Sequence, residues 1–506
     1  MFCPDPNVFL QEDLLGWLSA LGGWAPYLVS LLYIGILLGL ALYALHALVL
    51  ILLYLWHRKA PPLTAPVVPE EALPWVTVQV PLRNEQHVVQ QVLAAVAMLS
   101  WPLDRLEIQV LDDSDDVTTA LAAKQLARLR AQGLRTNLVH RDHPDGYKAG
   151  ALAEGLLRAR GEFIVIFDAD FCPASDFLRR TVPHLVTDPG LGMVQARWTH
   201  LNADYSVMTR VQALALDAHF SVEHLARSNS GLLMNFNGSA GVWRRAAIES
   251  AGGWQADTVT EDLDLSYRAQ LAGWRIRYLP DVTVAAELPP LLVSFKTQQV
   301  RWAKGASQVF RKLAGSIVRS PRLNVMQKVM ALMHLSGYTT QPLILMMILL
   351  TLPMVLTDPT FSGFVVWLSA LASIPPLLYV LGQMHFHRDW YRRILVYPVM
   401  MFLWIGFAWS LTLAVFDGWL HRGGIFVRTP KFRIRGVTGD WRRSSYRPRP
   451  NKSWIAELCI GIYVCIAAWT AVALNHEHLV PLVLSYVVAE LMVLGLTLVQ
   501  ELPAHR

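Results

Sequence analysis

The chain of 506 residues is short of charged side chains, because Asp, Glu, Lys and Arg together make up only 16% of it. In soluble proteins these four residue types make up about 25% of the chain. Hydrophobic residues make up 54% of this chain. Cysteine is also scarce, and four cysteines without a CxxC pair predict neither a disulfide framework nor a zinc site. The shortage of charge excludes a purely soluble protein. The apolar residues gather in long runs at both ends, which excludes a disordered chain and a uniform helical bundle.

One long apolar run lies near the N-terminus. Residues 24–56 contain no Asp, Glu, Lys or Arg. As a helix they would extend about 50 Å, against about 30 Å for the hydrocarbon core of a bilayer, so the run predicts a single tilted transmembrane helix. The residues before it lack the Lys and Arg of a signal peptide. His57, Arg58 and Lys59 follow it, and the positive-inside rule therefore places the N-terminus outside and the next segment in the cytoplasm.

The C-terminal part of the chain holds further apolar stretches at 334–356, 362–384, 394–416, 454–474 and 479–500. If all of them crossed, the segment 417–452 with its ten Lys and Arg residues would lie outside, against the positive-inside rule. We therefore predict that 394–416, which has basic residues on both sides, lies along the cytoplasmic interface or re-enters. Glu490 in the last stretch is expected to face the bundle interior or an aqueous path, or to bond a neighbouring helix in neutral form.

Between the apolar ends, residues 75–289 alternate short β-rich runs with helical ones. Strands that alternate with helices of this length predict βαβ units and a mainly parallel sheet. In such a sheet the chemistry lies where the strands end at their carboxyl edge. The expected strands are 76–80, 107–111, 137–140 and 163–167, and helices are expected at 88–99 and 120–131.

Two of the expected strands end in clusters of carboxylates. The segment 112–116 follows the second strand, and Asp168-Ala169-Asp170 follows the fourth. Clustered carboxylates repel one another unless a cation or hydrogen-bond donors compensate them. Asp168 and Asp170, at the end of an apolar strand, suit a hard divalent cation that also binds a diphosphate. Asp115 and Asp116 are expected to form turns or to cap a helix.

Two later segments combine polar residues at helical spacing. Glu261 and Asp262 stand near the start of an expected helix, where capping explains one acidic residue more easily than two. Gln298, Arg301 and Trp302 share one helical face. An arginine can fork onto phosphate oxygens, and an indole offers a flat surface for a sugar ring. The alternative for this face is an amphipathic helix at the membrane surface.

These motifs, in this order, resemble the D, DxD, TED, QxxRW signature of membrane-embedded family 2 glycosyltransferases. The matching residues are Asp112 or Asp113, Asp168-Ala169-Asp170, Thr260-Glu261-Asp262 and Gln298-Gln299-Val300-Arg301-Trp302. Residues 235–244 and Gln298-Gln299 are most similar to the plant cellulose-synthase-like mannan and glucan synthases. The segment 426–431 is similar to the FxVTxK gating loop of bacterial cellulose synthase, with Arg428 in place of the valine.

The resemblance implies a GT-A fold, which is Rossmann-like with a mainly parallel sheet, in a multi-pass helical membrane protein. It implies roles for residues that contact the donor, the acceptor and a metal ion. Asp112 or Asp113 would contact the nucleotide base, Lys148 would approach the phosphates, and Asp168 and Asp170 would hold Mg²⁺ or Mn²⁺. Asp262 would be the general base, with Glu261 and Asp113 as further catalytic candidates. Gln298 and Arg301 would hold the diphosphate, Trp302 would stack on the acceptor, and Phe426, Thr429 and Lys431 would close over the nucleotide.

The implied activity is inverting transfer from UDP-glucose or GDP-mannose to a β-linked polysaccharide, of the β-1,4-glucan or mannan type, in a processive manner. One alternative is transfer of a single sugar to a lipid such as ceramide or diacylglycerol. Another is a nucleotide-regulated channel or carrier. The expected partners are a nucleotide-sugar donor, a glycan or lipid acceptor and the lipid bilayer, without nucleic acid.

The expected location is the plasma (inner) membrane, with the catalytic domain in the cytoplasm. The expected organisation is an external segment 1–23, a transmembrane helix 24–56, a GT-A domain 57–310, an interface helix with two transmembrane helices 311–384, an interfacial helix with a basic gating loop 385–453, and two transmembrane helices with a short cytosolic tail 454–506.

Overall fold

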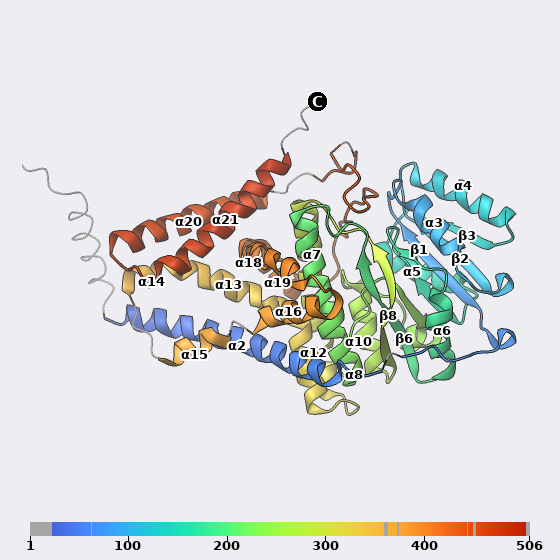
Figure 1. The fold of residues 1–506 in the computed structure, drawn as a ribbon, viewed down its shortest axis with the longest axis horizontal. Helices are drawn as coiled ribbons and strands as arrows, with labels where there is room; N and C mark the ends of the chain where they lie inside the picture. The colour runs from blue at the N-terminus through green and yellow to red at the C-terminus, as the bar shows by residue number, and fades with distance from the viewer. Residues whose placement is uncertain are drawn as a thin grey trace, which may run out of the picture.

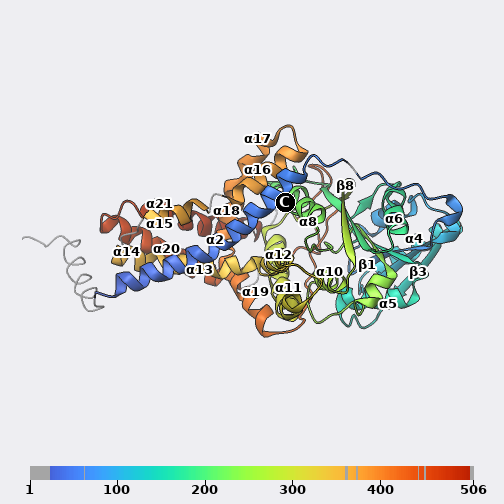
Figure 2. The ribbon, with the colours of Figure 1, turned by 90° about the horizontal axis from the view of Figure 1, so that it is seen from below.

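The chain forms a helical half and a sheet-containing half. The computed structural model describes residues 23–61, 63–358, 363–371, 374–442, 444–448 and 452–501. Long helices, among them α2, α13, α20 and α21, extend at one end, and the β-sheet with its covering helices lies at the other (Figures 1 and 2). All strands and helices predicted between residues 75 and 289 are present, within a few residues of their expected bounds.

The sheet has eight strands in the order β3-β2-β1-β4-β7-β6-β8-β5. Neighbours are parallel from β3 to β4 and between β6 and β8, while β7 and β5 run antiparallel to their neighbours. The expected α/β fold with a mainly parallel sheet is therefore confirmed. The strands are β1 (Val76–Leu82), β2 (Leu106–Asp112), β3 (Arg135–His140), β4 (Phe163–Ile166), β5 (Cys172–Pro173), β6 (Leu191–His200), β7 (Gly241–Arg244) and β8 (Arg275–Ala286).

Helices cover both faces of this sheet. Apolar side chains of α3 (Val89–Ala97), α4 (Thr118–Ala131) and α6 (Phe177–Thr187) pack on one face. Those of α5 (Tyr147–Arg158), α9 (Arg245–Ser250) and α10 (Glu261–Leu271) pack on the other. Strand β4 lies between the two layers with every residue at most 1% exposed. Burial on both faces explains why its sequence is apolar throughout and does not alternate with polar residues.

A layer of helices joins the sheet to the long helices. It contains α7 (Val207–Ala218), a π-helical turn (His219–Glu223), α8 (His224–Asn229), α11 (Leu292–Arg319) and α12 (Val325–Leu335). A capping box starts α7, since Ser206 Oγ accepts from the Thr209 amide and Thr209 Oγ1 accepts from the Ser206 amide. The apolar face of α10 (Glu261–Leu271), formed by Leu263, Tyr267 and Leu271, packs against α11 and α12.

Among the described residues, five helices are long and apolar enough to cross a membrane: Ala25–His57, Gly337–Thr357, Trp367–Phe386, Ser453–Ala473 and Val480–Gln500. The first is one continuous helix of 33 residues, as predicted. The individual helices are α2 (Ala25–His57), α13 (Thr340–Leu349), α14 (Thr351–Thr357), α15 (Gly363–Leu371), α16 (Pro375–Phe386), α20 (Ser453–Ala473) and α21 (Val480–Glu501). The expected external segment falls outside the described residues, apart from Gly23, and so do residues 502–506.

The stretch predicted not to cross is bent. It contains α17 (Trp390–Arg393), α18 (Tyr397–Gly406) and α19 (Ala408–Leu420). Helices Trp390–Gly406 and Ala408–Leu420 meet at 54°, the geometry of a broken span or a re-entrant loop. Whether this stretch crosses a bilayer stays a prediction.

Candidate active site

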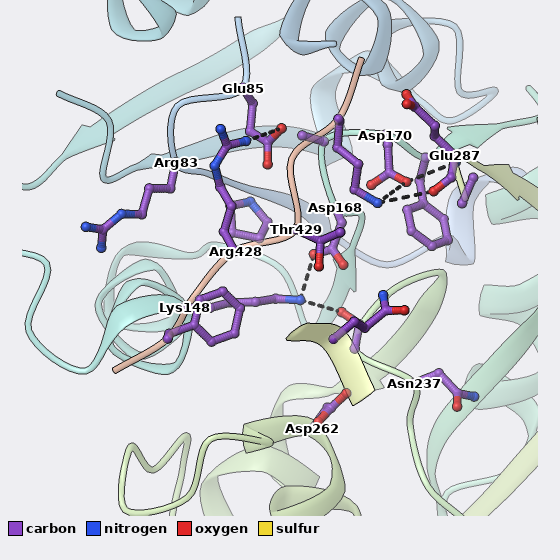
Figure 3. Close-up of a pocket in the computed structure, with 18 of the residues that line it drawn as sticks. Arg83, Glu85, Lys148, Asp168, Asp170, Asn237, Asp262, Glu287, Arg428 and Thr429 are labelled. Carbon is purple, nitrogen blue, oxygen red and sulfur yellow. Dashed lines mark hydrogen bonds and ion pairs between the residues drawn. The ribbon is translucent and has the colours of Figure 1, made fainter. Parts of the chain in front are cut away.

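A cavity of about 1340 Å³, open solvent at its mouth included, lies at the carboxyl ends of β1, β2 and β4. It brings together residues from loops, from α5, α10 and α11, and from the loop that follows α19 (Figure 3). Of the predicted site residues, all except Asp112 line it. They are Asp113, Lys148, Asp168, Asp170, Glu261, Asp262, Gln298, Arg301, Trp302, Phe426, Thr429 and Lys431.

Asp112 and Asp113 lie in different surroundings. Asp112 is fully buried in the sheet, where its carboxylate accepts from Thr119 Oγ1 at 2.6 Å and contacts His140 Nδ1 at 2.9 Å. Asp113 begins the loop after β2 and faces the cavity. The Arg141 guanidinium donates to both of its oxygens, at 2.7 and 2.6 Å. Of the two residues proposed from the sequence for base contact, only Asp113 can therefore reach a ligand in the cavity.

Asp168 follows β4 and is paired with Lys148. Lys148 Nζ, from the first turn of α5, donates to Asp168 Oδ1 at 2.6 Å and to the Gly238 carbonyl at 3.0 Å. Glu261 lies 3.8 Å from the same ammonium group. Burial disfavours the charge of Lys148, but Asp168 and Glu261 outweigh it and raise the pKa of Lys148. Lys148 therefore stays cationic at the point where the sequence predicts phosphates.

Asp170 is more deeply buried than Asp168 and is paired with Lys431. Lys431 Nζ donates to Asp170 Oδ2 at 2.8 Å, and the Glu287 amide donates to the same oxygen at 3.0 Å. Glu287 in turn accepts from the amides of Phe432 and Arg433, at 2.9 and 2.8 Å. Burial raises the pKa of Glu287 to about 7, although Lys431 and these amides act in the opposite direction. The loop after α19 is thus held onto the carboxylate cluster.

The pair Asp168 and Asp170 suits a divalent cation. Each carboxylate contacts a lysine ammonium group. These contacts show that both carboxylates stabilise a positive charge beside them. Carboxylate oxygens are the donors that Mg²⁺ and Mn²⁺ prefer. Within the described part of the chain, no group of three or more His, Cys, Asp or Glu side chains could hold a metal ion. Two carboxylates would therefore need ligand oxygens from a bound diphosphate to complete the coordination.

Asp262 is the second residue of α10 and lines the cavity. Burial, followed by the nearby Glu261 charge, raises the pKa of Asp262 to about 7, while Lys148 and Arg301 partly offset the rise. Among the residues that the structure describes, only the Leu263 amide donates to its carboxylate, at 2.8 Å. A carboxylate with a pKa near neutrality can accept a proton at physiological pH, as a general base must.

Gly238 allows Asp262 to approach the loop before β7. Its φ is 82°, and a Cβ atom there would lie 2.8 Å from Asp262 Oδ2. Any other residue would be strained and would push the carboxylate away. A glycine at this position therefore keeps Asp262 and the Gly238 carbonyl on the same cavity wall.

Helix α11 presents its predicted face to the cavity. Gln298, Arg301 and Trp302 all line it. The Arg301 guanidinium stacks on the Phe426 ring at 4.3 Å from the ring centroid. Its buried Nε has no hydrogen-bond partner within the described part of the chain. A buried donor without an acceptor is costly unless a ligand accepts its hydrogen bond. Arg301 is therefore available for an anion in the cavity.

The loop after α19 covers the cavity. Arg428 lies 3.0 Å from the Glu85 carboxylate and stacks on Tyr446 at 4.5 Å. The Tyr446 hydroxyl donates to Asp116, which also accepts from the Thr118 amide at the start of α4, at 2.8 Å. Asp116 therefore forms an Asx turn, the first of the two roles expected for it. The substitution of arginine for valine in the loop motif thus gives an additional ion pair across the cavity.

Two acidic residues of the cavity were missed from the sequence. Glu85 stands three residues after β1, and Glu287 directly follows β8. Burial raises the pKa of Glu85 to about 8, with Arg428 and Lys431 acting against the rise. The rule that chemistry follows strand ends applies to both positions, so it could have found them had it been applied to every strand.

The family described as glycosyltransferase like family 2 matches residues 74–305. Together with the strand order, this match confirms the expected GT-A fold and the resemblance drawn from the motifs. The matched segment begins just before β1 and ends within α11, so it contains Asp113, Asp168, Asp170, Asp262 and Arg301 but not the loop at 426–431.

Curated relatives show the same similarity. Glucomannan 4-beta-mannosyltransferase 2 of Arabidopsis thaliana is 45% identical over 260 residues, which is 51% of this chain and 49% of that protein. Glucomannan 4-beta-mannosyltransferase 1 of Oryza sativa is 44% identical over 268 residues, 52% of this chain and 51% of that protein. The matched region spans about half the length of these relatives. A solved mannosyltransferase from Pyrobaculum calidifontis, in complex with GDP-Man and Mn²⁺, is 23% identical with a TM-score of 0.49, and covers 77% of this chain and 99% of its own.

Proposed function

We propose that the chain, whose residues 74–305 match glycosyltransferase like family 2, is an inverting, processive membrane glycosyltransferase. It transfers mannose, or glucose, from GDP-mannose or UDP-glucose to a growing β-1,4-linked glycan. The observation that carries the proposal is the convergence of Asp168, Asp170, Asp262 and Arg301 in one cavity. The names of the similar proteins favour a mannosyl donor.

Asp262 acts as the base in this proposal. The acceptor hydroxyl loses its proton as its oxygen attacks the anomeric carbon, and one carboxylate within reach is sufficient to accept that proton. The pKa of Asp262, raised to about 7, gives its carboxylate the proton affinity that a general base needs at neutral pH. A single displacement inverts the anomeric centre, so an α-linked donor gives a β-linked product.

Positive side chains stabilise the leaving nucleoside diphosphate. Negative charge grows on the diphosphate as the glycosidic bond breaks, and Arg301 and Lys148 face the same cavity. Asp168 and Asp170 would hold Mg²⁺ or Mn²⁺, which supplies further charge stabilisation to the diphosphate when bound. Gln298 assists by hydrogen bonding, and Trp302 offers its indole face to the acceptor sugar.

The loop at 426–431 limits contact of the donor with water. Phe426 stacks on Arg301, and Lys431 reaches Asp170 from the same loop. A cover of this kind would reduce hydrolysis of the donor while the acceptor is in place. Phe426, Thr429 and Lys431 would therefore contact the donor when it is bound.

The test uses the purified full chain with Mn²⁺ and either GDP-mannose or UDP-glucose. Release of nucleoside diphosphate together with a product that an endo-β-1,4-mannanase or β-1,4-glucanase degrades is the expected result. Chelation of the metal with EDTA should abolish release, and added Mn²⁺ should restore it. Asp262→Asn should lower transfer by about 10²- to 10⁴-fold, the usual contribution of a general base.

Three results would overturn the proposal or part of it. A labelled product that partitions entirely into organic solvent would indicate a lipid acceptor. Unchanged transfer in Asp262→Asn would remove the base assignment. Nucleotide-dependent transport without transfer of any sugar would identify a carrier.

A further inference from the structure

Three ionisable side chains lie buried in the helical half, away from the cavity. Lys296 belongs to α11, Glu457 to α20 and Glu490 to α21, and they are 9%, 0% and 2% exposed. None of them lines the cavity. A buried charge is costly unless it is paired and hydrogen-bonded. The contacts that compensate these charges join separate helices of this half.

Lys296 joins three helices. Its ammonium group contacts the Glu457 carboxylate and donates to Ser453 Oγ at 2.8 Å, both in α20. Ser410 Oγ of α19 donates to the same Glu457 oxygen at 3.2 Å. Among the described residues, neither Glu457 Oε2 nor Glu490 Oε2 has a hydrogen-bond partner, so the contacts of Lys296 and Ser410 fall on one oxygen of Glu457. The single lysine therefore compensates Glu457, and Glu490 stands outside the pair.

A second contact fixes the same end of α11. The Leu292 amide, in the first turn of α11, donates to Gln500 Oε1 of α21 at 2.8 Å. Amides in the first turn of a helix have no acceptor within the helix, so an external acceptor holds that end in place. Helices α20 and α21 lie side by side and run from the tip of the helical half, near α14, toward the sheet-containing half (Figure 1). The hairpin thus holds α11 at two points, one turn apart.

The two points lie directly before the polar face of α11. Lys296 precedes Gln298 by two residues and Arg301 by five, a rise of about 7.5 Å along the helix. A shift of the first turn would therefore move Gln298 and Arg301 relative to Asp262 and the loop at 426–431. Misplacement of a binding group by about 1 Å can cost about a hundredfold in rate.

We propose that the hairpin α20–α21 positions the Gln298–Arg301–Trp302 face of α11 through the buried Lys296–Glu457 ion pair. Lys296 and Glu457 are positioning residues, because neither touches the cavity. This positioning role rests on the proposed function, because it concerns sugar transfer at the Gln298–Arg301–Trp302 face. The positions of the helices themselves can be measured without any reaction.

The experiment combines sugar transfer with a distance measurement in the full chain. Spin labels are placed on Cys465 of α20 and on Ser316→Cys of α11, both exposed positions, with Cys3, Cys172 and Cys459 replaced by serine. Pulsed electron paramagnetic resonance then reports the distance between the two helices. The variants are Glu457→Gln, Lys296→Met, the charge swap Lys296→Glu with Glu457→Lys, and Glu490→Gln as a matched control.

Glu457→Gln and Lys296→Met should broaden or shift the distance distribution and lower kcat/KM about tenfold or more. The charge swap should restore a narrow distribution and at least part of the activity. Glu490→Gln should leave both unchanged, because it removes an equally buried carboxylate that the lysine does not pair. For single variants that fail to fold, Ser410→Ala with Ser453→Ala weakens the same pair and should broaden the distribution to a smaller extent.

Unchanged distances and rates in Glu457→Gln would overturn the proposal, and so would an equal effect of Glu490→Gln or a swap that restores neither readout. The distance measurement separates the two proposals. A chain that transfers no sugar at all would refute the proposed function, while the distances would still decide whether the ion pair positions α11.

Discussion

Two adjacent residues at the end of a strand can have unrelated roles, as Asp112 and Asp113 show. Successive side chains of a strand point in opposite directions, and the chain leaves the sheet between these two residues. Asp112 therefore hydrogen-bonds inside the fold, while Asp113 meets Arg141 at the cavity. The sequence alone left the two open as alternatives, because both are aspartates in the same short run.

The two aspartates should respond differently to substitution. Asp113→Asn should raise the donor KM about tenfold, because it weakens a bidentate contact at the cavity wall. Asp112→Asn should leave the donor KM near the wild-type value but lower the melting temperature, since a buried network loses about 1–3 kcal/mol. Steady-state kinetics and thermal unfolding check the pair. A larger KM effect from Asp112→Asn would contradict the assignment.

The pH dependence of transfer should report Asp262. A base works in its ionised form, so a pKa raised to about 7 means that kcat/KM should rise with pH up to about 7 and level off above it. Glu261→Gln removes a neighbouring negative charge and should move the rise to lower pH. Initial rates between pH 5.5 and 8.5 test both statements. A profile that is flat across this range would refute the assigned base.

At the scale of elements, the loop after α19 completes the site. It lies more than 100 residues from the nearest other cavity residue in the chain, yet Arg428, Lys431 and the amides of Phe432 and Arg433 bind three acidic residues of the sheet edge. Its motif could be found from the sequence by resemblance. Its pairing with Glu85 and Glu287 could not, because these contacts join residues that lie more than a hundred positions apart in the chain.

The ion pair between Arg428 and Glu85 should hold this loop closed. Arg428→Met leaves the Glu85 carboxylate buried without its partner, so the loop should open more often and the donor KM should rise about tenfold. Hydrolysis of the donor by water should increase relative to transfer, because the cavity is less well covered. Rates of trypsin cleavage after Lys431 and Arg433 measure the opening without reference to catalysis.

The double variant Arg428→Met with Glu85→Gln is the control for that experiment. It removes both charges, so no unpaired carboxylate remains and part of the donor affinity should return. A double variant as impaired as Arg428→Met would show that the arginine acts on the donor directly rather than through Glu85.

At the scale of the whole molecule, the site lies where the two halves meet. The loops at the sheet edge carry Asp113, Asp168 and Asp170, and α11 carries Arg301 and Trp302. The start of α11 contacts α20 and α21. Helix α11 thus contacts two of the helices that could cross a membrane and also lines the cavity. Their orientation in a bilayer follows from the charge distribution, and we expect the cavity on the cytoplasmic side.

Cysteine labelling in intact cells should test that orientation. Val437→Cys lies exposed in the loop after α19 and should react with a membrane-impermeant maleimide only after the cells are opened. Glu477→Cys lies exposed between α20 and α21 and should react in intact cells. Native cysteines are replaced beforehand. The reverse pattern would invert the predicted topology.

The amino-acid sequence was enough to predict the α/β domain, four of the eight strands of its sheet, the single N-terminal helix and twelve residues of the cavity wall out of thirteen proposed. These are consequences of local periodicity and of motifs short enough to read along the chain. Only the tertiary structure decided that Asp113 rather than Asp112 faces the cavity, that Glu85 and Glu287 receive the loop, and that Lys296 pairs with Glu457 rather than Glu490. Each of these depends on which side chains meet across distances of tens to hundreds of residues, and burial then fixes their charge and partners.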